Sequence, residues 1–107
     1  MNLPDIVGPA VVNLGGLAVA NPPSGSRFQT LTARWVQFVT TGAGQVRLCN
    51  GGGTPTASFG LPVGAPYGSQ FLPAVSQGEN PPPYHLNALN VYVPAGATLS
   101  VMYEPFN

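Results

Sequence analysis

Charged residues are scarce in this sequence, and lysine is absent. Three arginines and three acidic residues make up 6% of the 107 residues, and the formal net charge is zero. Soluble proteins usually contain about 25% charged residues. A neutral surface of this kind favours association over free solution. Three arginines could neutralise only about three phosphates, too few for strong binding at physiological salt. The composition therefore argues against a nucleic-acid partner.

Cysteine and long apolar runs are also scarce. Cys49 is the only cysteine, so no disulfide can form within one chain and nothing indicates an oxidising compartment. No apolar run approaches the ~18 residues of a membrane span. Residues 11–20 end in a triplet that imitates a signal-peptide cleavage site, but no Lys or Arg precedes it, and prolines and glycines interrupt the apolar stretch. We expect a soluble protein that is made in a cytoplasm.

Glycine and proline, in contrast, are abundant. The 14 glycines and 13 prolines separate short apolar runs that are rich in Val, Thr and aromatic residues. No segment of about eleven residues, the mean length of a helix, keeps a helical period without a Gly or a Pro. Turn signals recur about every 8–12 residues, which is typical of all-β sandwiches and barrels. The pattern predicts one all-β domain, an antiparallel β-sandwich that is jelly-roll-like.

The clearest strand is predicted at residues 33–40. Neither of its two alternating faces is wholly polar, so we expect a central strand that is partly covered on both sides. A Thr-Gly-Ala-Gly turn at 41–44 would return the chain as strand 45–49. Val46 and Leu48 would then share one face of the returning strand. This arrangement predicts a hairpin between the two strands.

A second hairpin is predicted at the C-terminus. Residues 89–93 and 98–103 both alternate with period two, and the Pro-Ala-Gly-Ala sequence of 94–97 separates them. One face of each strand is apolar throughout and is expected to point into the core. The inward residues would be Leu89, Val91, Val93, Leu99, Val101 and Tyr103.

Weaker signals fill the rest of the chain. Strands are plausible at 56–61, 69–73 and 27–31, and residues 11–20 are expected to form a strand or a strand pair bent at the Gly-Gly sequence. Three successive prolines at 81–83 remove backbone donors and exclude a strand there.

The N-terminal residues 1–9 are predicted to be an extended arm, followed by a β-sandwich domain at 10–107. Two prolines within 1–9 disfavour an interior strand. Leu3, Ile6 and Val7 would then need an apolar partner surface, which makes them candidate interface residues.

Groups capable of catalysis are too few to form a recognisable motif. His85 is the only histidine, and we expect it in a loop or an interface, whereas Cys49 is expected to be a small buried hydrophobe. A Cys49–His85 nucleophile–base pair would have to form in space. The carboxylates Asp5, Glu79 and Glu104 have no motif spacing, and metal sites need three or four converging ligands. We therefore predict no enzyme, no catalytic residue, no cofactor and no metal.

Two other features admit a binding role. The loop 50–54 could present backbone amides to an anion, but it lacks the Lys and the helix of a phosphate loop. We interpret it as a turn. Four aromatic residues could form a platform for a sugar with nearby asparagines, although a core or interface position is the simpler interpretation. The set is Tyr67, Phe71, Tyr84 and Tyr92, with Asn87 and Asn90.

Arg34 and Arg47 lie in strands that contain no acidic residue. Their partners would be Glu79, Glu104 or a carboxylate of another chain, and we favour a partner across a subunit boundary. The candidate interface residues are therefore Leu3, Ile6, Val7, Arg34, Arg47, Tyr84, His85 and Phe106.

Four segments also carry a resemblance to a known class of protein. They are ARWVQFVTTGAGQVRLCN at 33–50, Gly60-Leu61-Pro62, QFLP at 70–73 and LNVYVPAGATLSVMYEP at 89–105. In the order of these segments and in their short sequence motifs, the chain resembles small virion proteins of tailed phages. The proteins it resembles are of the capsid decoration, or cement, type. The resemblance implies a compact β-domain on the outer capsid of a bacteriophage virion, commonly a trimer, whose partner is the major capsid protein.

The sparse charge is compatible with such a role, because apolar contacts are little screened by salt and clustered copies attach multivalently. We expect no nucleic-acid and no membrane partner. Two alternatives stay open. The chain could be a neck- or tail-associated phage structural protein, or a carbohydrate-binding β-sandwich module.

Overall fold

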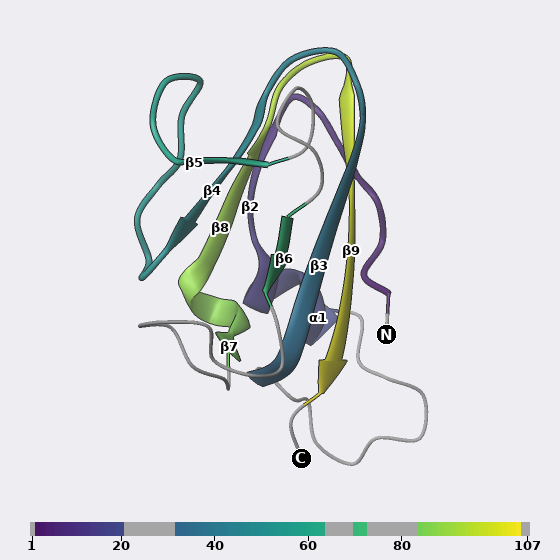
Figure 1. Ribbon diagram of the computed structural model, residues 1–107, viewed down its shortest axis with the longest axis vertical. Coiled ribbons are helices and arrows are strands. Elements are labelled where there is room, and N and C mark those ends of the chain that lie inside the picture. The colour runs from purple at the N-terminus through teal and green to yellow at the C-terminus, as the bar shows by residue number, and fades with distance from the viewer. Residues whose placement is uncertain (1, 21–31, 64–69, 73–83, 106–107) are drawn as a thin grey trace.

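The computed structural model describes residues 2–20, 32–63, 70–72 and 84–105, with the side chains of 70–72 left out of the description (Figure 1). These residues form two antiparallel sheets, one short α-helix and one 3₁₀ turn. The elements are β1 (Ile6–Val7), β2 (Ala10–Asn13), α1 (Leu14–Ala20), β3 (Thr32–Gly42), β4 (Val46–Asn50), β5 (Leu61–Val63), β6 (Gln70–Leu72), β7 (Tyr84–His85), η1 (Leu86–Ala88), β8 (Leu89–Val93) and β9 (Ala97–Pro105).

The sheet order is that of a jelly roll. The first sheet has the order β1-β9-β3-β6, with β7 also paired to β3, and the second sheet has the order β2-β8-β4-β5. If the two-residue β7 is left aside, the chain crosses to the other sheet after every strand except β4, which is followed by β5 in the same sheet. Two interleaved Greek keys require this pattern. The all-β sandwich predicted from the turn spacing is confirmed.

Apolar side chains from both sheets fill the space between them. The six C-terminal residues predicted to point inward are each at most 1% exposed, and Val46 and Leu48 are 1% and 3% exposed. Each such burial contributes about 1.5–3 kcal/mol relative to exposure. Among the described residues the core contains no buried polar or charged residue. The period-two pattern thus identified the inward faces correctly.

Both predicted hairpins are wrong. β3 pairs with β9, and β4 pairs with β8 in the other sheet, so each supposed hairpin joins two sheets. The physical reason is that an apolar face can be buried in either of two ways. Two alternating strands can lie side by side in one sheet, or they can face each other across a core. The sequence pattern is the same in both cases.

The two connections between the sheets pack against each other. The Ala43 N–H donates to the Gly96 carbonyl at 3.1 Å. Gly42 has φ +90°, and a Cβ atom there would lie 2.1 Å from the same carbonyl oxygen. A Cβ atom at Gly44 would lie 2.8 Å from Cγ of Pro94. Glycine is therefore required at these corners by the close approach of two chain segments.

β3 is central, as predicted, and its two faces are covered to different degrees. Ala33, Val36 and Phe38 are 0% exposed, whereas Trp35 is half-buried and Val39 is 42% exposed. The register with β9 shifts between Ala33 and Trp35, which is the mark of a bulge. The opposite face of β3 is partly covered, since Trp35 and Gln37 are of intermediate exposure.

The N-terminal segment is extended, but it packs on its own domain. β1 pairs with β9, and the Leu3 N–H donates to the Val101 carbonyl at 3.0 Å. Leu3 and Ile6 are 4% and 5% exposed and belong to the core. Their prediction as interface residues is wrong because the open edge of β9 accepts the segment. Prolines are tolerated there since β1 is an edge strand. Val7 alone of the three is exposed, at 67%.

The prediction for residues 11–20 is half wrong, because β2 ends at Asn13 and a helix follows. The Asn13 Oδ1 accepts a hydrogen bond from the Gly16 N–H at 2.9 Å, which satisfies a free donor in the first helical turn. Leu14 and Ala18, four residues apart, are buried on one face. Among the described residues no helix is long and apolar enough to span a membrane.

The weaker strand predictions have mixed outcomes. β6 confirms the strand expected at 69–73, whereas 56–61 is mostly a loop, in which Thr56 and Phe59 exchange backbone hydrogen bonds and only Leu61 enters β5. The segments 27–31 and 81–83 lie outside the described residues.

Candidate functional site

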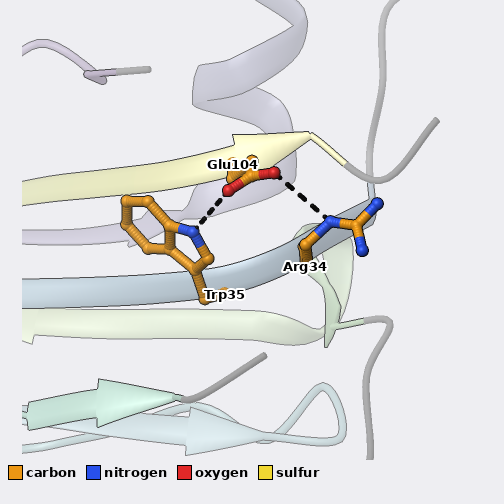
Figure 2. Close-up of polar contacts among 3 residues, drawn as sticks. All are labelled: Arg34, Trp35 and Glu104. Carbon is orange, nitrogen blue, oxygen red and sulfur yellow. Dashed lines mark hydrogen bonds and ion pairs between the residues drawn. The ribbon is translucent and has the colours of Figure 1, made fainter. Parts of the chain in front are cut away.

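Arg34, Trp35 and Glu104 form a polar cluster between β3 and β9. The Trp35 Nε1–H donates to Glu104 Oε2 at 2.7 Å, and Arg34 Nε lies 3.3 Å from Glu104 Oε1 (Figure 2). The bulge explains the geometry, since Trp35 is in register with Glu104 and Arg34 is the extra residue beside it. Arg34 thus pairs within its own chain. Glu104 was one of the carboxylates expected for Arg34, and a further partner on another subunit stays a prediction.

The cluster lies at the surface, so its contribution to stability is small. The Arg34 and Glu104 side chains are 45% and 50% exposed. Ion pairs at that exposure contribute about 0–1 kcal/mol. The hydrogen bond between the indole and the carboxylate fixes the orientation of Trp35.

Arg47 is likewise occupied within its own chain, by backbone carbonyls. Its Nε donates to the Ala57 carbonyl at 3.2 Å and its Nη1 to the Gly60 carbonyl at 2.9 Å. The half-buried guanidinium therefore ties the loop between β4 and β5 to the outer side of β4. A carboxylate partner for Arg47 on another subunit stays a prediction.

Tyr84 and His85 have different environments although they are adjacent. Tyr84 is 5% exposed, and burial raises the pKa of its hydroxyl. It is part of the core and is not available to a partner, which corrects its prediction as an interface residue. His85 is exposed on β7. Phe106 lies outside the described residues.

The structure does not bring Cys49 and His85 together, and it describes only part of the aromatic set considered from the sequence. Cys49 is a buried free cysteine in the second sheet, whereas His85 belongs to the first. Within the described ranges, no group of three or more His, Cys, Asp or Glu could hold a metal. Of the four aromatic residues, Tyr84 is buried, Tyr92 is half-buried in the other sheet, and the side chains of Tyr67 and Phe71 lie outside the description.

The glycine loop 50–54 turns its amides inward. The Gly51 and Gly52 N–H groups both donate to the Ala88 carbonyl, at 3.1 and 3.0 Å. The Gly53 carbonyl accepts a hydrogen bond from Asn90 Nδ2 at 2.8 Å. The loop is thus an anchored turn, and these two amides are not presented to an anion.

Two asparagines that sequence reasoning did not connect hold this region together. Asn13 Nδ2 donates to Asn90 Oδ1 at 2.7 Å and to the Asn87 carbonyl at 2.9 Å. With the bond from Asn13 Oδ1 to the helix, the pair links β2, α1, η1, β8 and the glycine loop. The only sequence feature that could have indicated this contact is the position of each asparagine near the end of a strand.

The outer side of the first sheet carries apolar and neutral polar side chains beside two carboxylates, Asp5 next to Ser100 and Glu104 next to Trp35. In register, Gln37 opposes Met102, Val39 opposes Ser100, and Val7 opposes Thr98. Val7, Val39 and Met102 are 67%, 42% and 40% exposed. We call this surface the first-sheet face; it consists of Asp5, Val7, Trp35, Gln37, Val39, Thr98, Ser100, Met102 and Glu104.

Other large apolar side chains are exposed on the second sheet. Val11 on β2 is 55% exposed, and Phe59 and Leu61, at the β5 edge, are 60% and 48% exposed. β2 and β5 are the two outer strands of this sheet. Exposed apolar groups therefore occur on both sheets of the sandwich.

Comparisons with known proteins found no match for this chain. No protein-family model matches it, and no curated protein and no solved structure does so. The function must therefore be argued from the surfaces and contacts described above.

Proposed function

We propose that this chain is a non-enzymatic virion protein of a bacteriophage, a capsid decoration, or cement, protein. It binds the major capsid protein on the outer surface as an oligomer and stabilises the shell. The observation that carries the proposal is the exposure of large apolar side chains on both sheets of a chain with only six charged residues.

A decoration protein that acts as an oligomer needs two kinds of contact. One surface joins the copies and another meets the capsid. The first-sheet face and the exposed residues at the edges of the second sheet offer two such surfaces on one small domain. Apolar contacts persist at high salt, because screening weakens only charge–charge attraction. Several copies attached together gain avidity from individually modest interfaces.

The internal arrangement of the charges supports an assembly role. All four charged side chains in the described residues contact groups of their own chain: Asp5, Arg34, Arg47 and Glu104. Both oxygens of Glu104 are engaged, which leaves this carboxylate less suited to gripping a sugar hydroxyl or transferring a proton. The carbohydrate-binding alternative therefore has less support. Jelly rolls are common in viral capsid proteins, but that likeness is one of fold alone.

The test is direct binding to capsids. The purified chain is mixed with undecorated capsids of the phage that encodes it, and bound protein is measured by co-sedimentation. We expect saturable binding and a higher temperature of capsid disruption. Phe59→Ser should weaken binding, whereas Val19→Ser, on the exposed side of α1, serves as the matched control. Absence of binding at micromolar protein would contradict the proposal.

A further inference from the structure

Asn50 and Gly51, where β4 ends, form the only Asn-Gly sequence in the chain. Asparagine is one of the thermolabile residues. It is most labile before glycine, because no Cβ atom there obstructs attack by the next backbone nitrogen on the side-chain amide. The Asn50 side chain is exposed, and a Cβ atom at Gly51 would have nothing within 4 Å. The space around the pair is therefore open enough for deamidation.

The fold itself keeps glycine at position 51. Gly51 has φ +96°, a left-handed backbone conformation that strains residues with a Cβ atom. Asn50 pairs with Leu89 through its backbone, so this pairing does not depend on the side-chain amide. The turn therefore places the most permissive neighbour directly after a reactive, exposed asparagine.

The attacking nitrogen, in contrast, is held in place. The Gly51 N–H donates to the Ala88 carbonyl at 3.1 Å. Asn90 Nδ2 donates to the Gly53 carbonyl at 2.8 Å and fixes the other side of the turn. Attack requires the Gly51 nitrogen to lose its proton and to approach Cγ of Asn50. The hydrogen bond to Ala88 must therefore break before the reaction can begin.

We propose that Asn50 is a site of spontaneous deamidation, and that opening of the anchored glycine turn sets its rate. The deprotonated Gly51 nitrogen attacks Cγ of Asn50 and a C–N bond forms. The Cγ–Nδ2 bond breaks, and Nδ2 takes a proton from water and leaves as ammonia. Water then opens the cyclic imide to aspartate or isoaspartate.

The products change the charge and the main chain of this region. Either product adds a negative charge to a chain whose net charge is zero. Isoaspartate also lengthens the main chain by a methylene group at the residue that pairs with Leu89. The inference does not rest on the proposed capsid role and is tested without capsids.

Peptide mass spectrometry of the full chain, incubated at pH 8 for several weeks, measures the conversion at each asparagine. Folded wild type should convert slowly, and at Asn50 before any other asparagine. The chain unfolded in urea should convert at Asn50 at least roughly tenfold faster, because no hydrogen bonds of the turn then have to break. Asn50→Gln should show no conversion at position 50 in either state, since glutamine must close a larger ring.

Asn90→Ala tests the role of the turn in the folded chain. It removes the hydrogen bond to the Gly53 carbonyl and should raise the rate at Asn50 roughly threefold or more. Val36→Ala, in the buried part of the first sheet, lowers the global stability without altering the turn. It is the control and should leave the rate unchanged. Circular dichroism checks that both variants are folded.

Four results would overturn the proposal. Folded wild type could show no conversion at Asn50, or could convert first at another asparagine. The folded and the unfolded chain could convert at equal rates, which would mean that the turn does not restrain the Gly51 nitrogen. Val36→Ala could raise the rate as much as Asn90→Ala does, in which case global unfolding and not opening of the turn would set it.

Discussion

At the scale of single residues, Asn13 stabilises the fold through both ends of one amide group. Its Nδ2 reaches η1 and β8, and its Oδ1 receives the N–H of Gly16 in α1. Asn13→Ala removes a helix cap, worth about 1 kcal/mol, and leaves the partly buried Asn90 amide without one partner. We expect a loss of about 2 kcal/mol in the free energy of unfolding, measured by urea denaturation.

Asn87→Ala is the control for this variant. The Asn87 side chain is exposed, and its part in the network is made by the backbone carbonyl, which alanine keeps. We expect a change below about 0.5 kcal/mol, as for ordinary surface substitutions. Equal losses for the two variants would show that the Asn13 amide has no special role.

The buried hydroxyl of Tyr103 should make the free energy of unfolding depend on pH. It is 1% exposed, and burial raises the pKa of its hydroxyl above the ordinary value of about 10. Below that value the hydroxyl is neutral in both the folded and the unfolded chain, so its stabilising contribution is complete. As the pH rises further, the unfolded chain ionises first, and the free energy of unfolding falls until the pH has passed the folded pKa.

The measurement is urea denaturation at pH 8 and pH 11. Wild type should be less stable at pH 11, and Tyr103→Phe should lose less stability between the two pH values. Tyr84, whose pKa burial also raises, should supply part of the remaining fall. A Tyr103→Phe variant with the same pH dependence as wild type would contradict this account.

At the scale of elements, two neighbouring glycines of α1 have opposite roles. A Cβ atom at Gly15 would lie 2.6 Å from Cα of Asn87, whereas one at Gly16 would have nothing closer than 3.8 Å. Gly15→Ala should therefore destabilise the fold by about 1–3 kcal/mol through overpacking. Gly16→Ala should stabilise it by about 0.4–1 kcal/mol, because alanine restricts the unfolded chain. Thermal unfolding of the pair tests both signs, and two changes in the same direction would refute the packing of α1 on η1.

The same helix shows where sequence reasoning fails. A Gly-Gly pair next to a strand signal indicated a bend, because glycine disfavours a helix. The helix nevertheless forms, because Asn13 caps it and because glycine, which has no Cβ atom, fits at position 15 against Asn87. Tertiary packing outweighed local propensity, and no local pattern announces such a contact.

Strand pairing is a second feature that the sequence pattern could not predict. Periodicity identified inward residues such as Val91 and Val101 correctly, because burial depends only on which face a side chain occupies. It could not say that β8 and β9 belong to different sheets, because both arrangements bury the same faces. The positive φ of Gly42 and Gly96 marks the corners, but hairpin turns also use glycine.

The candidate site could be predicted only in part, for a similar reason. Glu104 was one of the carboxylates considered for Arg34, yet 69 residues separate it from Trp35, and the bulge that aligns the cluster has no sequence signature. Leu3 and Ile6 were wrongly predicted as interface residues, because the sequence does not show that β9 offers an open edge to this segment. Val7 remains a surface residue, since it alternates with the buried Ile6.

At the scale of the whole molecule, the charged side chains of the described residues make contacts within the chain, and partly apolar surfaces lie beside them. Arg47 fixes the loop beside β5, and Glu104 fixes Trp35. Apolar and neutral polar side chains are exposed on both sheets, beside the half-exposed Arg34 and Glu104 on the first. An assembly formed through such surfaces should be nearly independent of ionic strength, whereas charge-driven docking weakens as the Debye length falls from about 10 Å at 0.1 M salt to 3 Å at 1 M.

Binding to undecorated capsids as a function of salt therefore tests the proposed function most directly. The purified chain is titrated onto capsids at 50 mM and at 1 M sodium chloride, and the dissociation constant is measured at each concentration. The proposed role predicts saturable binding whose dissociation constant changes less than about threefold, since uncharged contacts are not screened. Binding that is lost at 1 M salt, or that never occurs, would contradict it.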